Sequence, residues 1–176
     1  AYVQKRSKGI RFLNLFGYTG TVSVCSALGG AVSSTTIDLS NTYVDWARQN
    51  YEANGLDFDA HHLIRTDCLG WLREAEKGLQ GDVRFDMIYF DPPTFSNSKA
   101  MGGGSFDVLR DHAVWIERSL SLLSEEGILI FRCNRRGFVM SFENDSYSVK
   151  DISKQTLAKD FERKANTHHC FEIRKN

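Results

Sequence analysis

The feature that most constrains the fold is the segment Asp91-Pro92-Pro93-Thr94, which directly follows the apolar run at 85–90. Proline lacks a backbone N–H and has a fixed φ, so the two prolines, the only ones in the chain, must end a strand rigidly. Open α/β sheets bind ligands at the carboxyl ends of their parallel strands. We therefore expect a buried strand that delivers the Asp91 carboxylate to a ligand site. An acidic turn without a ligand is the alternative interpretation.

Short apolar runs alternate with amphipathic segments along most of the chain. We expect strands over residues 11–16, 31–37, 61–66, 83–90 and 127–133, and helices over 21–28, 40–54, 69–78 and 106–123. This order predicts a doubly wound, Rossmann-like α/β sheet with right-handed crossovers. Two further strands are expected at 146–152 and 170–173, with short helical stretches at 135–142 and 157–163. The polar, glycine-rich residues 94–105 are expected to form a mobile loop.

The composition is typical of one globular domain, with 176 residues, 41% hydrophobic and 25% charged. We expect a linker at 1–10, left from a longer protein, and a functional domain at 11–176. No apolar run approaches the roughly 20 residues of a membrane span. The four cysteines form no CxxC pair, and the histidines have no carboxylate or cysteine partner at metal spacing. These patterns predict no metal site, and reduced thiols in a cytoplasmic protein.

Charge is balanced overall but unevenly distributed. The chain has 22 basic and 22 acidic residues. Residues 1–11 carry four cations and no acid, residues 132–176 carry 10 Lys and Arg against 6 Asp and Glu, and the stretch between carries 8 against 16. Basic ends around an acidic body suit an anionic polymer that binds on one side. Ordinary solvated charge is the alternative.

A glycine-containing turn, residues 16–20 (FGYTG), follows the first expected strand. A dinucleotide site needs the spacing G-x-G-x-x-G, because the pyrophosphate must approach both the backbone and a helix N-terminus. This turn lacks that spacing. A methionine moiety needs only a closely approaching turn with a polar rim, which Asn14, Gly17 and Thr19 are expected to supply. The turn therefore favours S-adenosylmethionine over a dinucleotide.

Carboxylates follow three of the expected strands, at Asp38, Asp67 and Asp91. Asp38 is placed to accept both ribose hydroxyls of a nucleoside cofactor, which NAD and S-adenosylmethionine share. Asp67, with Cys68 beside it, is placed for the adenine amino group. Capping of the next helix is the alternative for Asp67. A hydride-transfer enzyme also needs a substrate acid or base near the nicotinamide, and none stands out, so an oxidoreductase is the weaker interpretation.

Two motifs, residues 12–20 (FLNLFGYTG) and 90–99 (FDPPTFSNSK), resemble those of bacterial large-subunit ribosomal RNA methyltransferases. The similarity is greatest to the C-terminal, guanine-N7 half of the two-domain enzymes that modify 23S ribosomal RNA. Further matching positions are 134–138, 151–152, 156, 160–161 and 169–170. The resemblance implies a class I methyltransferase fold, mostly parallel with an antiparallel last strand, and S-adenosylmethionine as the donor. It also implies a preceding RNA-binding segment and a second catalytic half before Ala1.

The resemblance and the strand-end positions together predict a set of site residues. Asp91, Pro92 and Pro93 are the expected catalytic residues. Expected cofactor contacts are Asn14, Phe16, Gly17, Tyr18, Thr19, Gly20, Asp38, Leu39, Asp67, Cys68 and Asp91. Expected RNA contacts are Thr94, Phe95, Lys99, Arg135 and Arg136, with Phe95 stacked on a flipped base and the cations on phosphates. For Phe95 a ring folded back on the sheet, and for the cations a solvated surface, are the alternatives.

One departure from the family pattern lies after the fifth expected strand. A Ser-Asn-Asn run is expected there, and this chain has Arg132-Cys133-Asn134. A related subfamily that makes 5-methylcytosine carries a cysteine near this point, because a thiolate must first add to carbon 6 of cytosine. Cys133 beside Arg132 is the candidate for such a thiolate, although the tail fits the guanine enzymes better. An inactive RNA-binding or scaffold fragment is the alternative of another class.

Overall fold

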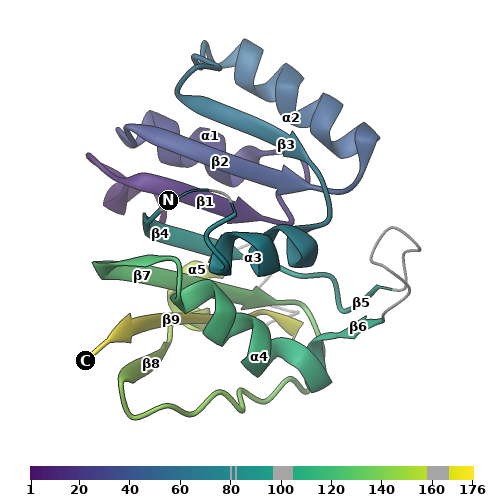
Figure 1. Cartoon of the computed structure of the whole chain (residues 1–176), viewed down its shortest axis with the longest axis vertical. Helices are drawn as coiled ribbons and strands as arrows, with labels where there is room; N and C mark the ends of the chain where they lie inside the picture. Colours follow the sequence, from purple (N-terminus) through teal and green to yellow (C-terminus); the bar gives the residue numbers. More distant parts are fainter. Residues whose placement is uncertain (80, 82, 97–104, 158–166) are drawn as a thin grey trace.

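A seven-stranded sheet forms the centre of the protein. The computed structural model describes residues 1–79, 81, 83–96, 105–157 and 167–176. The sheet has the order β3-β2-β1-β4-β7-β9-β8 (Figure 1). Its strands are β1 (Arg11–Leu15), β2 (Ser33–Asp38), β3 (His61–Arg65), β4 (Phe85–Phe90), β7 (Leu123–Cys133), β8 (Tyr147–Asp151) and β9 (His169–Lys175). All neighbouring pairs from β3 to β7 are parallel, and β9 is antiparallel to both β7 and β8. The expected doubly wound fold with an antiparallel last strand is confirmed.

Helices connect the strands, and a small hairpin stands apart from the main sheet. The helices are α1 (Thr21–Leu28), α2 (Asn41–Ala53), α3 (Cys68–Glu76), α4 (Val108–Leu120) and α5 (Ser153–Thr156), with the 3-10 turn η1 (Gln4–Arg6) near the N-terminus. β5 (Phe95–Ser96) pairs antiparallel with β6 (Phe106–Asp107). Among the described residues, no helix combines the length and apolar composition that crossing a bilayer requires.

Both faces of β4 and of the C-terminal half of β7 are largely buried, which explains why these segments are mostly apolar. Because side chains alternate along a strand, Ile88 and Phe90 of β4 belong to the core cluster that α3 and α4 cover (Figure 1). Met87 points to the opposite face and packs in a second cluster with Phe12 and Ile130. Two cores of this kind fix the sheet from both sides, so its carboxyl edge is a rigid platform for a site.

One helical prediction is wrong in its extent, and another predicted helix does not form. The helix expected from residue 106 begins at Val108, because Asp107 caps it by accepting the Leu109 N–H at 2.8 Å, and Phe106 is paired in β6. No helix forms over 135–142. Phe138 and Phe142 have helical spacing, yet they reach the core as parts of a loop. The loop expected at 94–105 and the helix expected at 157–163 fall largely outside the described residues.

The segment 1–10 packs on the same body as the rest of the chain. Val3 is 8% exposed, and the buried Ser7 donates to the Val3 carbonyl oxygen and accepts from the Ser26 hydroxyl. The Tyr2 hydroxyl donates to the carboxylate of Glu172 on β9. The boundary at residue 11 between a linker and a functional domain stays a prediction.

The buried His112 predicts a pH dependence of stability. Its Nδ1 lies 2.7 Å from the Val108 carbonyl oxygen, and its Nε2 accepts the Ser141 N–H at 3.0 Å, so the neutral ring fits the site. Burial lowers the pKa of His112 below its usual 6.5. The unfolded chain therefore binds the proton more tightly, and stability falls as the pH drops below about 6.5. We expect urea unfolding between pH 5 and 8 to show a shallower acid loss in His112→Gln than in wild type or in the exposed-site control His62→Gln. Equal slopes in all three proteins would contradict this assignment.

Candidate active site

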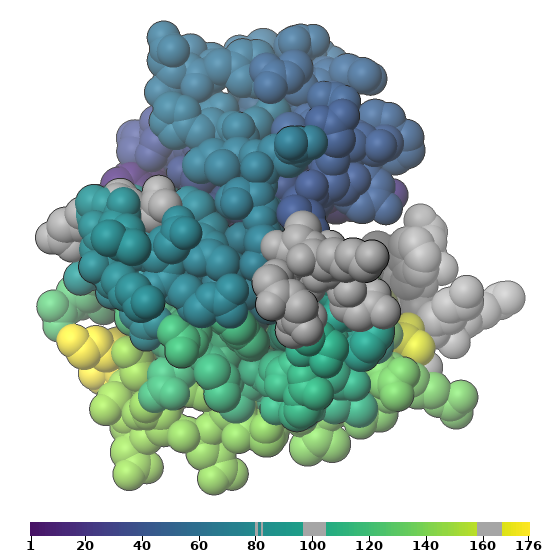
Figure 2. All heavy atoms as spheres, turned by 45° about the vertical axis from the view of Figure 1, so that its right-hand side comes forward, coloured from purple at the N-terminus to yellow at the C-terminus, as the bar shows by residue number. Residues whose placement is uncertain are grey.

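A cavity of about 580 Å³ lies at the carboxyl edge of the parallel strands. Residues that follow β1, β2, β3 and β4 line it, together with the end of β7. Its described lining consists of Phe16, Tyr18, Asp38, Leu39, Ser40, Tyr43, Asp67, Cys68, Asp91, Pro92, Pro93, Ser96, Arg132 and Asn134. The carboxyl ends of the parallel strands lie on the right in Figure 1, and Figure 2 turns that side forward. The cavity is therefore at the place where an open α/β sheet binds its ligand.

The turn after β1 is strained and bends over β2. Phe16 and Tyr18 have φ values of 59° and 49°, a left-handed backbone conformation that residues other than glycine rarely adopt. The Gly17 N–H donates to the Ile37 carbonyl oxygen at 2.9 Å. A Cβ on Gly17 would lie 2.3 Å from Cγ2 of Thr36, so no larger residue fits without displacement. Such strain is typical of binding loops held by the surrounding fold, and here it directs Phe16 and Tyr18 into the cavity wall.

Asp38 joins two loops at the end of β2. Its Oδ2 accepts the Tyr18 N–H at 2.9 Å, and its Oδ1 accepts the Ser40 N–H at 2.8 Å. Ser40 in turn caps α2 by accepting the Tyr43 N–H. A carboxylate oxygen has more than one lone pair, so Asp38 retains acceptor capacity toward the cavity. This arrangement fits the expected ribose contact.

Asp67 caps α3, as the alternative interpretation proposed. Its two oxygens accept the N–H groups of Leu69 and Gly70 at 3.3 and 2.8 Å. The neighbouring Cys68 thiol donates to the Ile37 carbonyl oxygen and accepts the Phe16 N–H. Burial strongly raises the pKa of this thiol, so Cys68 stays protonated and acts as a structural link. Both residues line the cavity, and an adenine contact by Asp67 stays a prediction.

Asp91 forms an ion pair with Arg132 at the other end of the cavity. Arg132 Nη1 lies 2.6 Å from Asp91 Oδ2, and Nη2 donates to the Asn134 side-chain oxygen at 3.0 Å. Burial raises the pKa of the Asp91 carboxyl, and the Arg132 guanidinium opposes that rise. Sequence reasoning did not predict Arg132 as a site residue. The available signal was strand adjacency, because Phe90 pairs with Phe131 and so places residues 91 and 132 side by side.

Several predicted residues lie outside the described cavity wall. Asn14 is 1% exposed and donates to the Ser23 hydroxyl inside the core, so its expected contact with a methionine moiety stays a prediction. The other residues absent from the wall are Gly17, Thr19, Gly20, Thr94, Phe95, Arg135 and Arg136. Phe95 is 55% exposed, and both arginines are also exposed. Lys99 falls outside the described residues. Ser40, Tyr43, Ser96, Arg132 and Asn134 line the cavity without having been predicted.

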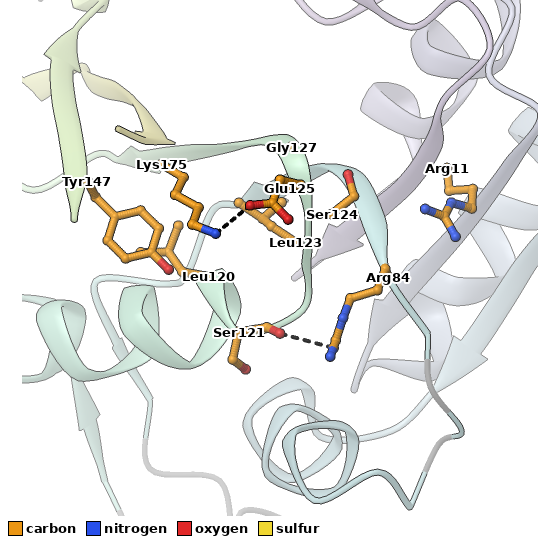
Figure 3. Close-up of a pocket in the computed structure, with 10 residues that line it drawn as sticks. All are labelled: Arg11, Arg84, Leu120, Ser121, Leu123, Ser124, Glu125, Gly127, Tyr147 and Lys175. Atoms are coloured by element: carbon orange, nitrogen blue, oxygen red, sulfur yellow. Dashed lines mark hydrogen bonds and ion pairs between the residues drawn. The ribbon is translucent and has the colours of Figure 1, made fainter.

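Another cavity, of about 620 Å³, lies at the opposite edge of the sheet (Figure 3). Arg11, Arg84 and Lys175 contribute to its wall. Lys175 pairs with Glu125 at 2.7 Å, Arg84 donates to the Ser121 carbonyl oxygen at 3.1 Å, and Arg11 pairs with Asp86 at 3.2 Å. Its position at the amino ends of the parallel strands and the internal pairing of its charges separate it from the candidate active site.

The sheet order, with its antiparallel last strand, and the cavity at the carboxyl ends of the parallel strands are those of a Rossmann-like methyltransferase. A family model for S-adenosylmethionine-dependent methyltransferases matches residues 1–154, and the chain belongs to this family. Its cofactor is accordingly S-adenosylmethionine, as the turn after β1 predicted. The cavity wall suits that group, since it offers carboxylates for an adenosyl moiety and an apolar surface from Phe16, Leu39 and Pro92.

Solved structures agree with this assignment. The chain is similar to SMU.776, a proposed methyltransferase solved with S-adenosylhomocysteine, with a TM-score of 0.79 and 26% identity over 97% of this chain and 47% of the other. A methyltransferase from Agrobacterium tumefaciens matches with a TM-score of 0.73 and 19% identity, over 99% and 58% of the two chains. The ribosomal protein L11 methylase from Lactobacillus delbrueckii subsp. bulgaricus gives 0.67 and 16%, over 99% and 76%. The chain thus spans about half the length of SMU.776, and the two less similar structures support the fold alone.

Replacement of Asp38 tests the ribose end of the cavity. We expect Asp38→Ala to weaken S-adenosylhomocysteine binding at least about tenfold in calorimetric titration, because hydrogen bonds to a charged group contribute roughly 1.5–3 kcal/mol. Asp45→Ala, which removes an exposed acid from α2, is the matched control and should bind as wild type does. An unaltered dissociation constant in Asp38→Ala would show that the ribose lies elsewhere.

Gly17 and Thr36 give a second test, of the turn itself. Gly17→Ala places a Cβ against Thr36 Cγ2, so we expect a loss of about 1–3 kcal/mol in unfolding free energy and weaker S-adenosylhomocysteine binding. The double variant with Thr36→Ser removes that methyl group and retains the hydroxyl that contacts Ser23 and Tyr51. It should recover most of both losses. If the double variant binds and unfolds like Gly17→Ala alone, close packing against Thr36 is not the reason for the glycine.

Proposed function

We propose that the chain transfers a methyl group from S-adenosylmethionine to N7 of guanine in 23S ribosomal RNA, in the cytoplasm. The observation that carries the proposal is the placement of Asp91, Pro92 and Pro93 at the cofactor cavity, within a segment that resembles the guanine-N7 enzymes. The family establishes the cofactor, whereas the RNA acceptor and the methylated atom are parts of the proposal.

Guanine N7 suits this site because it needs no general base. When bound, the cofactor supplies a sulfonium methyl group, which the in-plane lone pair of N7 attacks as the carbon–sulfur bond breaks. No proton leaves the acceptor, and the positive charge passes from sulfur to the purine. The protein then contributes mainly positioning, which is worth several kcal/mol in well-oriented reactions. An acid fixed in an ion pair, as Asp91 is, is consistent with a reaction of this type.

Asp91 is proposed to hold the guanine edge. Its Oδ2 is bound to Arg132, and no described residue hydrogen bonds to its Oδ1. The guanine N1–H and exocyclic amino group can donate to this second oxygen. Pro92 and Pro93 restrict the backbone at and after Asp91, since proline has a fixed φ and limits the conformation of the residue before it.

Exposed residues around the cavity are proposed to bind the RNA strand. Phe95 on β5 presents a half-exposed ring, and base stacking on such a ring contributes roughly 1–3 kcal/mol. Arg135 and Arg136 are exposed after β7 and suit phosphates. Thr94 and, outside the described residues, Lys99 complete the proposed RNA contacts. We also propose that a region preceding residue 1 adds RNA affinity and a second catalytic half, as the resemblance to the two-domain enzymes implies.

The environment of Cys133 disfavours 5-methylcytosine formation. Its thiol is 1% exposed, accepts the Arg135 N–H at 3.2 Å and does not line the described cavity. Burial raises the pKa of Cys133, which opposes formation of the thiolate that attack on cytosine requires. We infer that Cys133 is structural. An inactive scaffold is also disfavoured, since the wall of the cofactor cavity is intact.

Methylation of 23S ribosomal RNA with a radiolabelled cofactor tests the proposal. We expect label at guanine N7, located by chemical cleavage at 7-methylguanine, with about a hundredfold lower rate in Asp91→Ala at saturating cofactor. Cys133→Ala should retain the activity and serves as the control for the cytosine mechanism. Label at carbon 5 of cytosine that disappears in Cys133→Ala would overturn the proposal, as would full activity in Asp91→Ala.

A further inference from the structure

The amino-acid part of the cofactor needs a partner for its negative charge. S-adenosylmethionine and S-adenosylhomocysteine each carry one carboxylate, on the methionine or homocysteine end. The described residues that line the cavity include three carboxylates, Asp38, Asp67 and Asp91, and a single cation, Arg132. Electrostatic complementarity therefore points to Arg132, since a carboxylate placed beside any of the three acids alone would be repelled.

The order of the strands places Arg132 at the correct end of the cavity. Asp67 follows β3 and Asp38 follows β2, so the adenosyl group lies at that side in the ribose and adenine assignments above. Neighbouring strands are about 4.8 Å apart, and three steps from β3 reach β4 after about 14 Å. The Arg132 side chain extends from β7 back to Asp91 beside β4. Its guanidinium thus lies where an extended adenosyl amino acid ends.

The Arg132 guanidinium also has N–H donors beyond those that bind Asp91 and Asn134. Arginine carries five N–H donors in a planar fork. The described structure uses one Nη1 donor on Asp91 and one Nη2 donor on Asn134. Two carboxylates can share one guanidinium through different edges of the fork. The side chain is 28% exposed, so it remains accessible from the cavity while Asp91 and Asn134 hold its orientation.

The polar groups that the sequence suggested for this role are used elsewhere. The Asn14 amide donates to Ser23 in the core, and the Asn14 side chain is buried. The Thr19 hydroxyl is bonded to Thr21, and its carbonyl oxygen accepts from Asn50. Neither residue lines the described cavity. The end of the cavity beyond β1 therefore relies on β7 for its positive charge.

We propose that Arg132 binds the carboxylate of the cofactor's amino-acid moiety, and that Asp91 and Asn134 hold the guanidinium in place for this contact. The contact determines selection between cofactors that carry the carboxylate and analogues that lack it. It is independent of the acceptor, so it stands whether or not the methylated group is guanine N7.

The first experiment compares two ligands on the wild-type chain. Calorimetric titration with S-adenosylhomocysteine and with its decarboxylated analogue, S-adenosyl-3-thiopropylamine, measures the contribution of the carboxylate alone. We expect the analogue to bind about tenfold to a hundredfold more weakly, as loss of a charge-assisted contact implies. A wild-type chain with no preference for S-adenosylhomocysteine, at any affinity, overturns the proposal.

The second experiment assigns that preference to Arg132. In Arg132→Met the preference should fall to about one, through weaker binding of S-adenosylhomocysteine and unchanged binding of the analogue. Arg132→Lys retains the charge without the fork and should keep an intermediate preference. Arg118→Met is the matched control, because Arg118 is also a partly exposed arginine in an ion pair, with Glu76, outside the cavity.

The double variant Asp91→Asn/Arg132→Met separates ligand binding from the effect of an unpaired acid. It removes both charges, and the preference should again be about one. If Arg132→Met fails to fold in circular dichroism, Arg132→Lys and the double variant provide the comparison. The proposal is overturned if folded Arg132→Met prefers S-adenosylhomocysteine over the analogue as strongly as wild type does. The same holds if the affinities for both ligands fall equally, because another residue then binds the carboxylate.

Discussion

The parallel pairing of β1 with β2 and β4 is the constraint on which the site depends. Leu15 is in register with Ile37 on one side and Phe90 on the other. The next residue of each strand is therefore at the same edge, and these residues are Phe16, Asp38 and Asp91. A shift of one residue would move every core side chain to the other face. Burial of both faces thus fixes the register, and the register assembles residues that are distant in sequence.

Placing three carboxylates at a partly buried edge of the sheet costs desolvation free energy. A buried carboxylate without a partner is strongly unfavourable, so each acid is bound by donors. Asp38 is satisfied by two backbone N–H groups, Asp67 by the first turn of α3, and Asp91 by Arg132. The first two solutions also order the adjacent loops and helices. The same three carboxylates therefore order the carboxyl edge of the sheet and line the cofactor cavity.

The sequence predicted the elements whose local signals agree with their tertiary environment. α1 has the expected bounds, and Ser40 caps α2 as its residue type indicated. The loop at 135–142 was misjudged because Phe138 and Phe142 have helical spacing, although tertiary contacts bury them in irregular backbone. A local pattern cannot distinguish an amphipathic helix from a loop with two buried side chains, since both can have apolar residues four positions apart.

The candidate site also contains residues that a local sequence signal predicts and residues that only tertiary contacts reveal. Strand ends revealed Asp38 and Asp91, because a carboxylate after an apolar run is a local signal. The burial of Asn14 had no such signal, since its partners Ser23 and, through it, Thr36 come from α1 and β2. Arg132 required knowledge that β4 and β7 are neighbours with Phe90 opposite Phe131. A contact between residues 41 positions apart in the sequence can be predicted only when the strand register is known.

The Asp91–Arg132 pair is better explained by ligand binding than by stability. Desolvation of two charges usually offsets most of their attraction, and apolar replacements of buried pairs are often neutral or stabilising. The pair here is also 22–28% exposed, which weakens its attraction further by solvent screening. A fold that needed only rigidity at this edge would gain little from it. A site that must receive a zwitterionic amino-acid group gains a fixed cation beside a fixed acid, and this complementarity gives a physical reason for an arginine at the end of β7.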